Sequence, residues 1–147
     1  MRRFLQTRLQ RLSSRKGKEE STDHKKAIGD HKVRAILESD PSVLSVSVLG
    51  REGGVSSIAR SAQLHKEEYA DERTLQQLGT VGTVILGAAV KAEGLFGSTE
   101  FILGTLKKGK ILLVNLPEYD SALAVRLSRA ANAEYLFGKI SEILARG

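Results

Sequence analysis

The short turns between strand-like segments constrain the fold of this chain more than any other feature of its sequence. Leu44, Val46 and Val48 alternate with serines, which is the pattern of a strand with one buried face. A glycine-containing turn at 51–54 leads into a second short strand at about 55–59. Strands joined by so few residues pair antiparallel, because a parallel crossover needs a dozen residues or more. The sequence therefore predicts an antiparallel hairpin in its first half.

Three further strands are predicted in the second half, at about 98–106, 110–116 and 121–127. Residues 107–109 join the first two and form a short loop whose glycine is placed for a β-bulge. Both of these strands carry apolar side chains on both faces. Strands that are buried on both faces lie in the centre of a sheet covered by helices, so we expect these two strands there.

Helical patterns flank and separate the two groups of strands. The first covers about 27–39 and ends before Pro41, because the residue preceding a proline is pushed out of helical space. A long pattern runs from about 66 to 91, and the last covers about 133–145. The order αββαβββα predicts one α/β domain of the α+β type at 27–147, with a five-stranded, mainly antiparallel sheet flanked by helices. The apolar face of the first helix consists of Val33, Ile36 and Leu37.

The long helical pattern contains glycines within a regular apolar stripe. Gly79, Gly82 and Gly87 each cost about 1 kcal/mol relative to alanine in a helix. Such a cost is tolerated more readily where something packs close to the backbone. That neighbour is either the helix's own sheet or a partner chain, and the sequence leaves both possibilities open. The stripe recurs at helical spacing, at Leu75, Leu78, Gly82, Ile85 and Ala89.

The residue types that carry out catalysis are absent or badly placed. The chain has no cysteine, which excludes disulfides, zinc–thiolate sites and cysteine nucleophiles. Residues 104–110 have the spacing of a phosphate-binding loop, but Ile111 stands where a hydroxyl should bind Mg²⁺, and a strand follows where a helix is required. None of His24, His31 and His65 has metal-ligand spacing. We therefore expect no enzyme, no catalytic residue, no cofactor and no bound metal.

Charge divides the chain into two parts. The whole sequence carries a net charge of +6, and residues 1–26 account for all of it with nine basic and three acidic side chains. The remainder holds 14 side chains of each sign. From Ser13 to Lys26 nearly every residue is polar or charged, which leaves too little apolar surface to offset the entropy of ordering. We expect a disordered basic tail at 1–26 ahead of a neutral folded domain.

The first dozen residues of the tail combine apolar and basic side chains. On a helical wheel the apolar ones share a broad arc bordered by arginines, a pattern suited to an anionic membrane surface, although Arg8 falls within that arc. The alternatives are a tail that stays disordered or folds on a partner, and contact with nucleic acid. Nucleic acid is the less favoured ligand because Phe4 is the only aromatic side chain there that can stack on a base. The candidate contact residues are Arg2, Arg3, Phe4, Leu5, Arg8, Leu9, Arg11 and Leu12.

Residues 43–59, with the sequence VLSVSVLGREGGVSSIA, are similar to the opening hairpin of roadblock (dynein light chain) domains. There a strand meets a charged, glycine-containing turn and returns through a short strand that ends in alanine. The resemblance covers about 27–147 and implies a five-stranded antiparallel sheet between helices, related to profilin-like folds. It also implies a homodimer joined through the long helix and the neighbouring strand. The matching positions are Leu75, Leu78, Gly79, Gly82, Ile85, Ala89, Thr99, Phe101 and Leu103.

Roadblock domains serve as scaffolds or regulators of Ras-like small GTPases, and some accelerate GTP hydrolysis by positioning the GTPase's own residues. The resemblance therefore implies an adaptor or regulator of a small GTPase. The basic tail departs from the family's core pattern, so its function does not come with the resemblance. We expect the protein in the cytoplasm, held near a membrane by the tail. The resemblance assigns no catalytic arginine, and Arg51, Arg126 and Arg129 stay open. The rival hypothesis is a polyanion-binding module, in which the tail binds nucleic acid or an anionic membrane and the domain only dimerises it.

Overall fold

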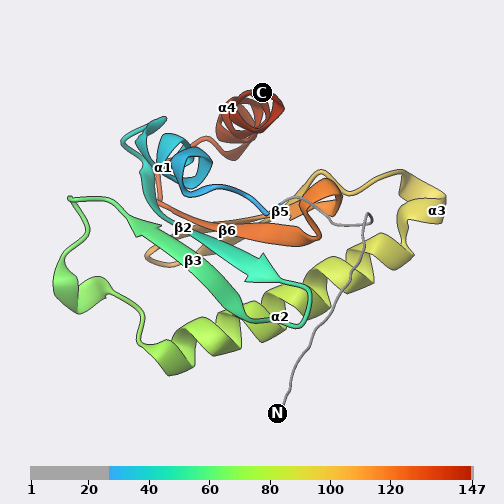
Figure 1. The fold of residues 1–147 in the computed structure, drawn as a ribbon, viewed down its shortest axis with the longest axis horizontal. Coiled ribbons are helices and arrows are strands. Elements are labelled where there is room, and N and C mark those ends of the chain that lie inside the picture. Colours follow the sequence, from blue (N-terminus) through green and yellow to red (C-terminus); the bar gives the residue numbers. More distant parts are fainter. Residues whose placement is uncertain (1–26, 147) are drawn as a thin grey trace, which may run out of the picture.

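A computed structural model describes residues 27–146, and the predictions for the tail at 1–26 lie outside these residues. The order of elements follows the predicted pattern, with two short 3-10 turns and one short helix added (Figure 1). The elements are α1 (Asp30–Glu38), β2 (Val43–Gly50), β3 (Val55–Arg60), η2 (Lys66–Glu68), α2 (Glu72–Lys91), α3 (Glu93–Phe96), β4 (Phe101–Leu106), β5 (Gly109–Leu116), η3 (Pro117–Tyr119), β6 (Ser121–Leu127) and α4 (Ala133–Ala145).

The five strands form one antiparallel sheet in the order β3-β2-β6-β5-β4. Both predicted hairpins are present, as β2–β3 and β4–β5. The strand β6, last in the sequence, lies between them and pairs with β2 on one side and β5 on the other. The predicted α+β fold with a five-stranded antiparallel sheet is confirmed.

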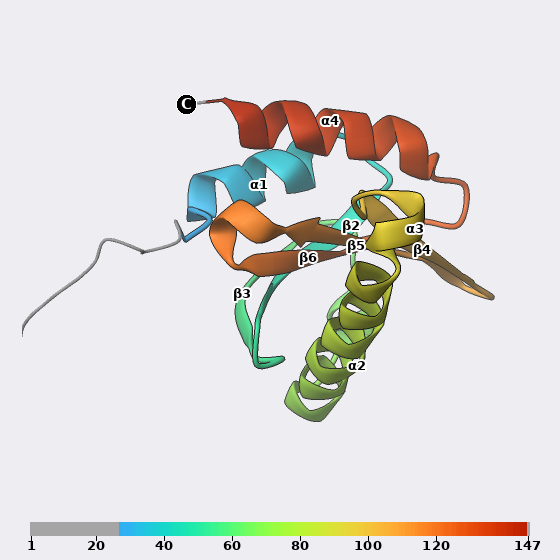
Figure 2. The same ribbon diagram turned by 90° about the vertical axis from the view of Figure 1, so that its right-hand side faces the viewer.

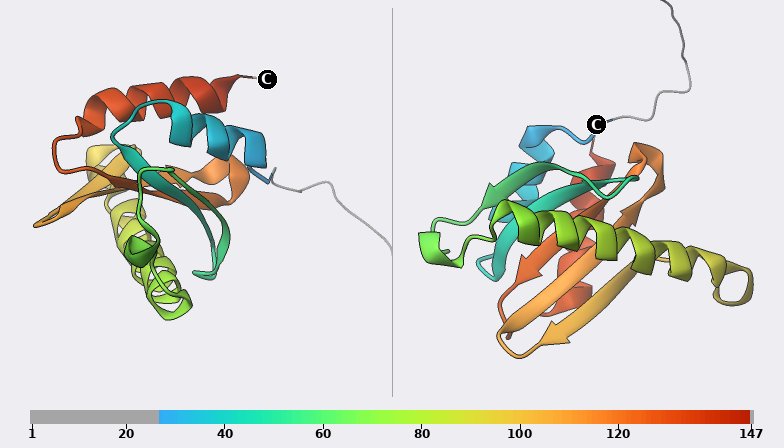
Figure 3. Two further views of the ribbon diagram at one scale, coloured as in Figure 1. Left: turned by 90° about the vertical axis from the view of Figure 1, so that its left-hand side faces the viewer. Right: turned by 90° about the horizontal axis from the view of Figure 1, so that it is seen from below.

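Helices cover both faces of the sheet, but unequally. Figures 2 and 3 show α1 and α4 side by side on one face, while α2 crosses the other face alone. The larger core lies beneath α1 and α4 and includes Val33, Ile36 and Leu37, as their shared helical face predicted. A smaller core lies beneath α2, around Leu86 and Leu113. Because a single helix crosses this second face, part of the sheet beside it stays uncovered. Within 27–146 no helix is both long and apolar enough to cross a membrane.

The strand β4 lies at one edge of the sheet, and the prediction that it lies in the centre is wrong. Its apolar side chains are only partly covered. Phe101 packs against Phe137 of α4 with 4.9 Å between the ring centroids, and Ile102 contacts the core beneath α2. Leu103 and Leu106 remain exposed. The two apolar faces of β4 therefore do not reflect complete burial by this chain's own helices.

Two further boundaries differ from the prediction. Leu106 pairs directly with Gly109, so the β4–β5 loop has two residues and the pairing contains no bulge. The long helix begins at Glu72 and not near Lys66. Asp71 is its N-cap, and its Oδ1 accepts a hydrogen bond of 2.8 Å from the backbone N–H of Thr74.

The segment before α2 is held to the sheet and does not extend the helix. Leu64 is buried there, and Arg126 of β6 donates a hydrogen bond of 2.9 Å to the carbonyl oxygen of Glu68. Arg60 of β3 lies over the ring of Tyr69, 4.3 Å from its centroid. These contacts between distant parts of the sequence outweigh the helix propensity of the glutamates at 67 and 68.

Candidate interaction surface

The described residues contain neither a metal-ligand cluster nor a phosphate-binding loop. Between residues 27 and 146 no group of three or more His, Cys, Asp or Glu side chains could hold a metal ion. Residues 104–110, with the spacing of a phosphate-binding loop, form the β4–β5 hairpin that the sequence predicts. Lys110, the lysine of that spacing, donates a hydrogen bond of 2.8 Å to the carbonyl oxygen of Ala131. It therefore holds the segment before α4.

Local hydrogen bonds account for three shifted pKa values. Hydrogen bonds from Ser42 lower the pKa of Asp40, and hydrogen bonds from Thr74 lower the pKa of Asp71. A side-chain hydrogen bond with Tyr135 raises the pKa of Lys139. The shifts of Asp40 and Asp71 arise within a turn and a helix N-cap, and that of Lys139 arises chiefly from a neighbour one turn away in α4, so these three groups do not mark a catalytic site.

The three arginines that the sequence left unassigned all hold loops in place. Arg51 forms an ion pair with Asp120, which joins the β2–β3 turn to the β5–β6 connection. Arg126 donates to the carbonyl of Glu68, as described above. Arg129 donates a hydrogen bond of 2.6 Å to the carbonyl oxygen of Leu106, at the end of β4.

Two glycines of the predicted interface face the chain's own sheet. A Cβ atom on Gly79 would lie 1.8 Å from the carbonyl oxygen of Gly53, in the β2–β3 turn. A Cβ atom on Gly82 would lie 3.1 Å from Leu49 and 3.6 Å from Leu113. Contacts within the chain thus account for both glycines, and the open question about their neighbour is settled in favour of the sheet.

The other predicted interface positions on α2 divide between buried and exposed. Leu75, Leu78 and Ala89 are half-buried on the side of the helix that faces the sheet. Ile85 is exposed. The outward surface of α2 is therefore available to a partner, whereas much of the predicted stripe is not.

A second apolar stripe on α2 was missed at the sequence level. Val81, Val84, Ile85 and Ala88 are exposed and follow the spacing i, i+3, i+4, i+7, with Val84 66% exposed. The opposite flank of the helix, which includes Thr83 and Gly87, faces the β2–β3 turn. The apolar stripe therefore lies on the outward side of α2, away from that turn. Its spacing was visible in the sequence, where it ran beside the glycine stripe.

The edge strand β4 continues this apolar area. Leu106 lies on the face that α2 crosses and is 60% exposed, and the outer edge of the strand has no neighbouring strand within the described part of the chain. Leu103 is also exposed, but it lies on the opposite face, because it pairs with Leu112 of the core beneath α1 and α4. Of the other predicted positions, Phe101 packs on α4, and the backbone N–H of Thr99 donates to Glu93 (2.7 Å). We call the exposed area of Val81, Val84, Ile85, Ala88 and Leu106, together with the free edge of β4, the α2–β4 surface.

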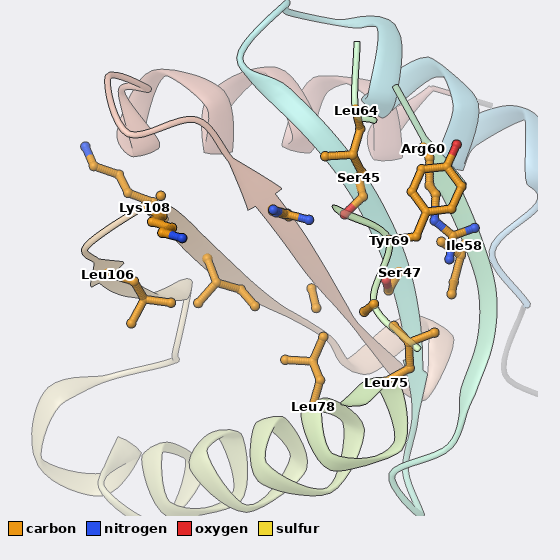
Figure 4. A pocket seen from close by; sticks show the side chains of 16 residues that line it. Ser45, Ser47, Ile58, Arg60, Leu64, Tyr69, Leu75, Leu78, Leu106 and Lys108 are labelled. Atoms are coloured by element: carbon orange, nitrogen blue, oxygen red, sulfur yellow. The ribbon is translucent and has the colours of Figure 1, made fainter. Parts of the chain in front are cut away.

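A groove opens on the uncovered part of the sheet beside the first half of α2 (Figure 4). It encloses about 240 Å³. Its apolar lining includes Leu75, Leu78, Leu106 and Ile111, and its polar lining includes Ser45, Ser47, Arg60, Lys108 and Arg126. No aspartate or glutamate lines it, so its charge is positive. We call it the basic groove.

A second groove, of about 540 Å³, lies beside the other half of α2. The ion pair between Arg51 and Asp120 borders it, and Asp120 has a left-handed backbone with φ of 52°. Lys91 and Glu93 line it as well, so it carries both signs of charge. Its lining therefore indicates no particular class of ligand.

Comparison with solved structures shows the fold of roadblock/LC7 domains. A roadblock/LC7 domain from Streptomyces avermitilis has a TM-score of 0.62 and 16% sequence identity, over 80% of this chain and 92% of that chain. The gliding protein MglB from Thermus thermophilus has a TM-score of 0.60 and 17% identity, over 82% and 93%. MglB from Myxococcus xanthus has a TM-score of 0.57 and 15% identity, over 80% and 94%. No protein-family model and no curated protein sequence matches the chain.

Proposed function

We propose that this chain is a non-enzymatic, dimeric adaptor that binds a Ras-like small GTPase and regulates it. The observation that carries the proposal is the α2–β4 surface on a roadblock fold. This surface is apolar and uncovered, whereas the described residues hold no cluster that could bind a metal ion. An exposed apolar area with polar surroundings is typical of a site that binds another protein.

The position of the surface favours a symmetric dimer. Two copies of β4 can pair edge to edge, which satisfies the free backbone groups of both strands and extends the sheet across the dimer. The apolar flanks of the two α2 helices then meet on one face of that sheet. A twofold interface uses the same patch on both copies, and an edge strand beside an apolar helix flank meets this requirement. One structure of MglB has a tetrameric arrangement, so this fold supports assembly in that protein.

Three arginines already form hydrogen bonds or an ion pair within the chain, and this limits how they could act on a GTPase. Arg126 and Arg129 donate to backbone carbonyls, and Arg51 pairs with Asp120. If one of these three arginines acted on the GTPase, it would first have to leave its present contact. We therefore propose that any acceleration of GTP hydrolysis comes from positioning the GTPase's own residues.

We also propose that the protein works in the cytoplasm.

Retention of GTPases on the purified protein tests this function. The full chain and a variant lacking residues 1–26 are immobilised and exposed to Ras-like GTPases of the native organism, loaded with GDP or a non-hydrolysable GTP analogue. We expect both forms to retain the same GTPase, with a preference for one nucleotide state, because the binding surface belongs to the folded domain. Retention by neither form, or retention that is lost with the tail, would contradict the proposal.

The charge of the tail supports a second candidate function. Because residues 1–26 carry the whole net charge of +6, a polyanion-binding module would bind through them. In that case DNA or anionic vesicles should retain the full chain, and raising the salt from about 50 to 200 mM should weaken retention at least tenfold through counterion release. Deletion of residues 1–26 should abolish it. Comparing DNA with phosphatidylserine vesicles and with neutral vesicles identifies the ligand, and retention unaffected by the deletion would exclude this role for the tail.

A further inference from the structure

We infer that Leu95 and Phe96 of one copy insert into the basic groove of a second copy, so that two equivalent contacts close the dimer. This inference rests on the dimer of the proposed function and adds an occupant to a groove that would otherwise stay open. Four properties support it: the exposure of the two side chains, the lining of the groove, the charges of the two parts and their separation within one copy.

Leu95 and Phe96 are strongly exposed apolar side chains. They are 85% and 84% exposed, on the short helix α3 that projects beyond the end of α2 (Figure 1). Burying a leucine or phenylalanine side chain stabilises a protein by about 1.5–3 kcal/mol relative to leaving it in water. Two adjacent side chains of this kind on a projecting helix are suited to fill an apolar recess in another molecule.

The basic groove offers an apolar recess beside the start of α2. Leu75 and Leu78 of α2 form one wall, and Leu106 and Ile111 contribute to the other. Ser47, also in the lining, is only 3% exposed, so the floor of the groove is closely packed. The apolar part of the lining therefore suits a leucine or phenylalanine side chain.

The charges of the two parts are complementary. The segment 92–100, which contains the exposed pair, carries Glu93 and Glu100 and no basic residue. The groove contains Arg60, Lys108 and Arg126 and no acidic residue. The same comparison disfavours the chain's own tail as the occupant, because the net charge of +6 in residues 1–26 would be repelled by the groove.

The separation of the two parts requires a second copy. The groove lies beside Leu75 and Leu78 near the start of α2, whereas Leu95 follows its end. At about 1.5 Å per residue, the axial distance from Leu78 to Leu95 is about 25 Å, so α3 cannot reach the groove of its own chain. In an antiparallel pair of α2 helices, the end of each helix lies beside the start of the other. Each α3 then lies next to the partner's groove.

Crosslinking between two singly substituted proteins tests the contact directly. The chain has no cysteine, so Phe96→Cys and Lys108→Cys each introduce one thiol. We expect a short bis-maleimide crosslinker, which tolerates looser geometry than a disulfide, to join them when the two proteins are mixed. Neither protein should crosslink with itself, because equal positions lie at opposite ends of the antiparallel pair. A mixture of Phe96→Cys with Glu142→Cys, on the opposite face of the sheet, serves as the control.

Light scattering separates a failure of this inference from a failure of the proposed dimer. We expect Phe96→Ser to weaken dimerisation at least tenfold, whereas Tyr135→Ser, which removes an exposed ring from α4, should leave it unchanged. A dimer that forms without the crosslink and ignores Phe96→Ser would overturn the inference and leave the proposed function standing. Crosslinking of Phe96→Cys with itself would also overturn it. A monomeric unsubstituted chain would overturn both.

Discussion

Replacing Gly79 with alanine is expected to lower the free energy of unfolding by about 3 kcal/mol, although alanine favours a helix by about 1 kcal/mol over glycine. The reason is the close approach of α2 to the β2–β3 turn. A Cβ atom at Gly79 would lie 1.8 Å from the carbonyl oxygen of Gly53 and 2.9 Å from its carbonyl carbon. Both are backbone atoms, which cannot rotate away. The turn cannot easily yield either, because Gly53 has a φ of 91° and lies close to the backbone of Thr80.

A matched substitution at Gly87 separates this contact from helix propensity. Gly87 lies in the same helix, and a Cβ atom there would meet nothing within 4 Å. Gly87→Ala should therefore stabilise the protein by up to about 1 kcal/mol. Urea denaturation followed by circular dichroism gives both values. If Gly79→Ala proved as stable as the unsubstituted chain, the helix and the turn would be farther apart than described, and the second core would be looser.

The elements whose side chains follow one clear period could be predicted closely. The strand β6 and the helix α4 have the predicted boundaries, 121–127 and 133–145. In α4 a single apolar face includes Leu136 and Ile140, and the amide side chain of Asn132 caps the first turn by accepting from the N–H of Tyr135 (3.0 Å). Such signals are local, so they can be recognised without knowledge of the tertiary structure.

The errors occurred where distant parts of the chain decide the outcome. The residues before Glu72 have helix-forming composition, yet Arg126 holds Glu68 against the sheet. The apolar faces of β4 predicted a central strand, but the strand order depends on the pairing of β2 with β6, about 75 residues later in the sequence. The periodicity of a sequence shows which side chains are apolar. It does not show whether the residues that bury them belong to the same chain or to a partner.

The candidate surface was only partly predictable for the same reason. The resemblance to roadblock domains pointed to α2 and β4, which both carry exposed apolar side chains, but it favoured the glycine stripe on α2. The structure shows that Gly79 and Gly82 touch the chain's own turn and core. The apolar positions left for a partner are those on the neighbouring flank, such as Val84. A stripe of small residues and a stripe of exposed valines have the same period, so only their tertiary surroundings distinguish them.

Val84→Asp is expected to convert the proposed dimer into a monomer. Val84 is 66% exposed in the single copy, so a carboxylate there is solvated and the fold should remain stable. In the dimer the same position would be buried against the partner, and a twofold axis would place the new charge in the interface twice. Burying an unpaired charge costs several kcal/mol, so we expect dimerisation to weaken at least a hundredfold.

Gln76→Asp is the matched control for this substitution, because it adds the same charge to the same helix on the flank away from β4. Sedimentation or light scattering at micromolar concentration should show a monomer for Val84→Asp and a dimer for Gln76→Asp, with unfolding transitions close to that of the unsubstituted chain. If Val84→Asp remained a dimer, the outward flank of α2 would not be the interface, and β4 pairing alone would have to hold the copies together. If it became monomeric and still retained the GTPase, dimerisation and GTPase binding would use different surfaces. The oligomeric state and the retention of the GTPase can both be measured on these two variants, because neither substitution alters the core beneath α2.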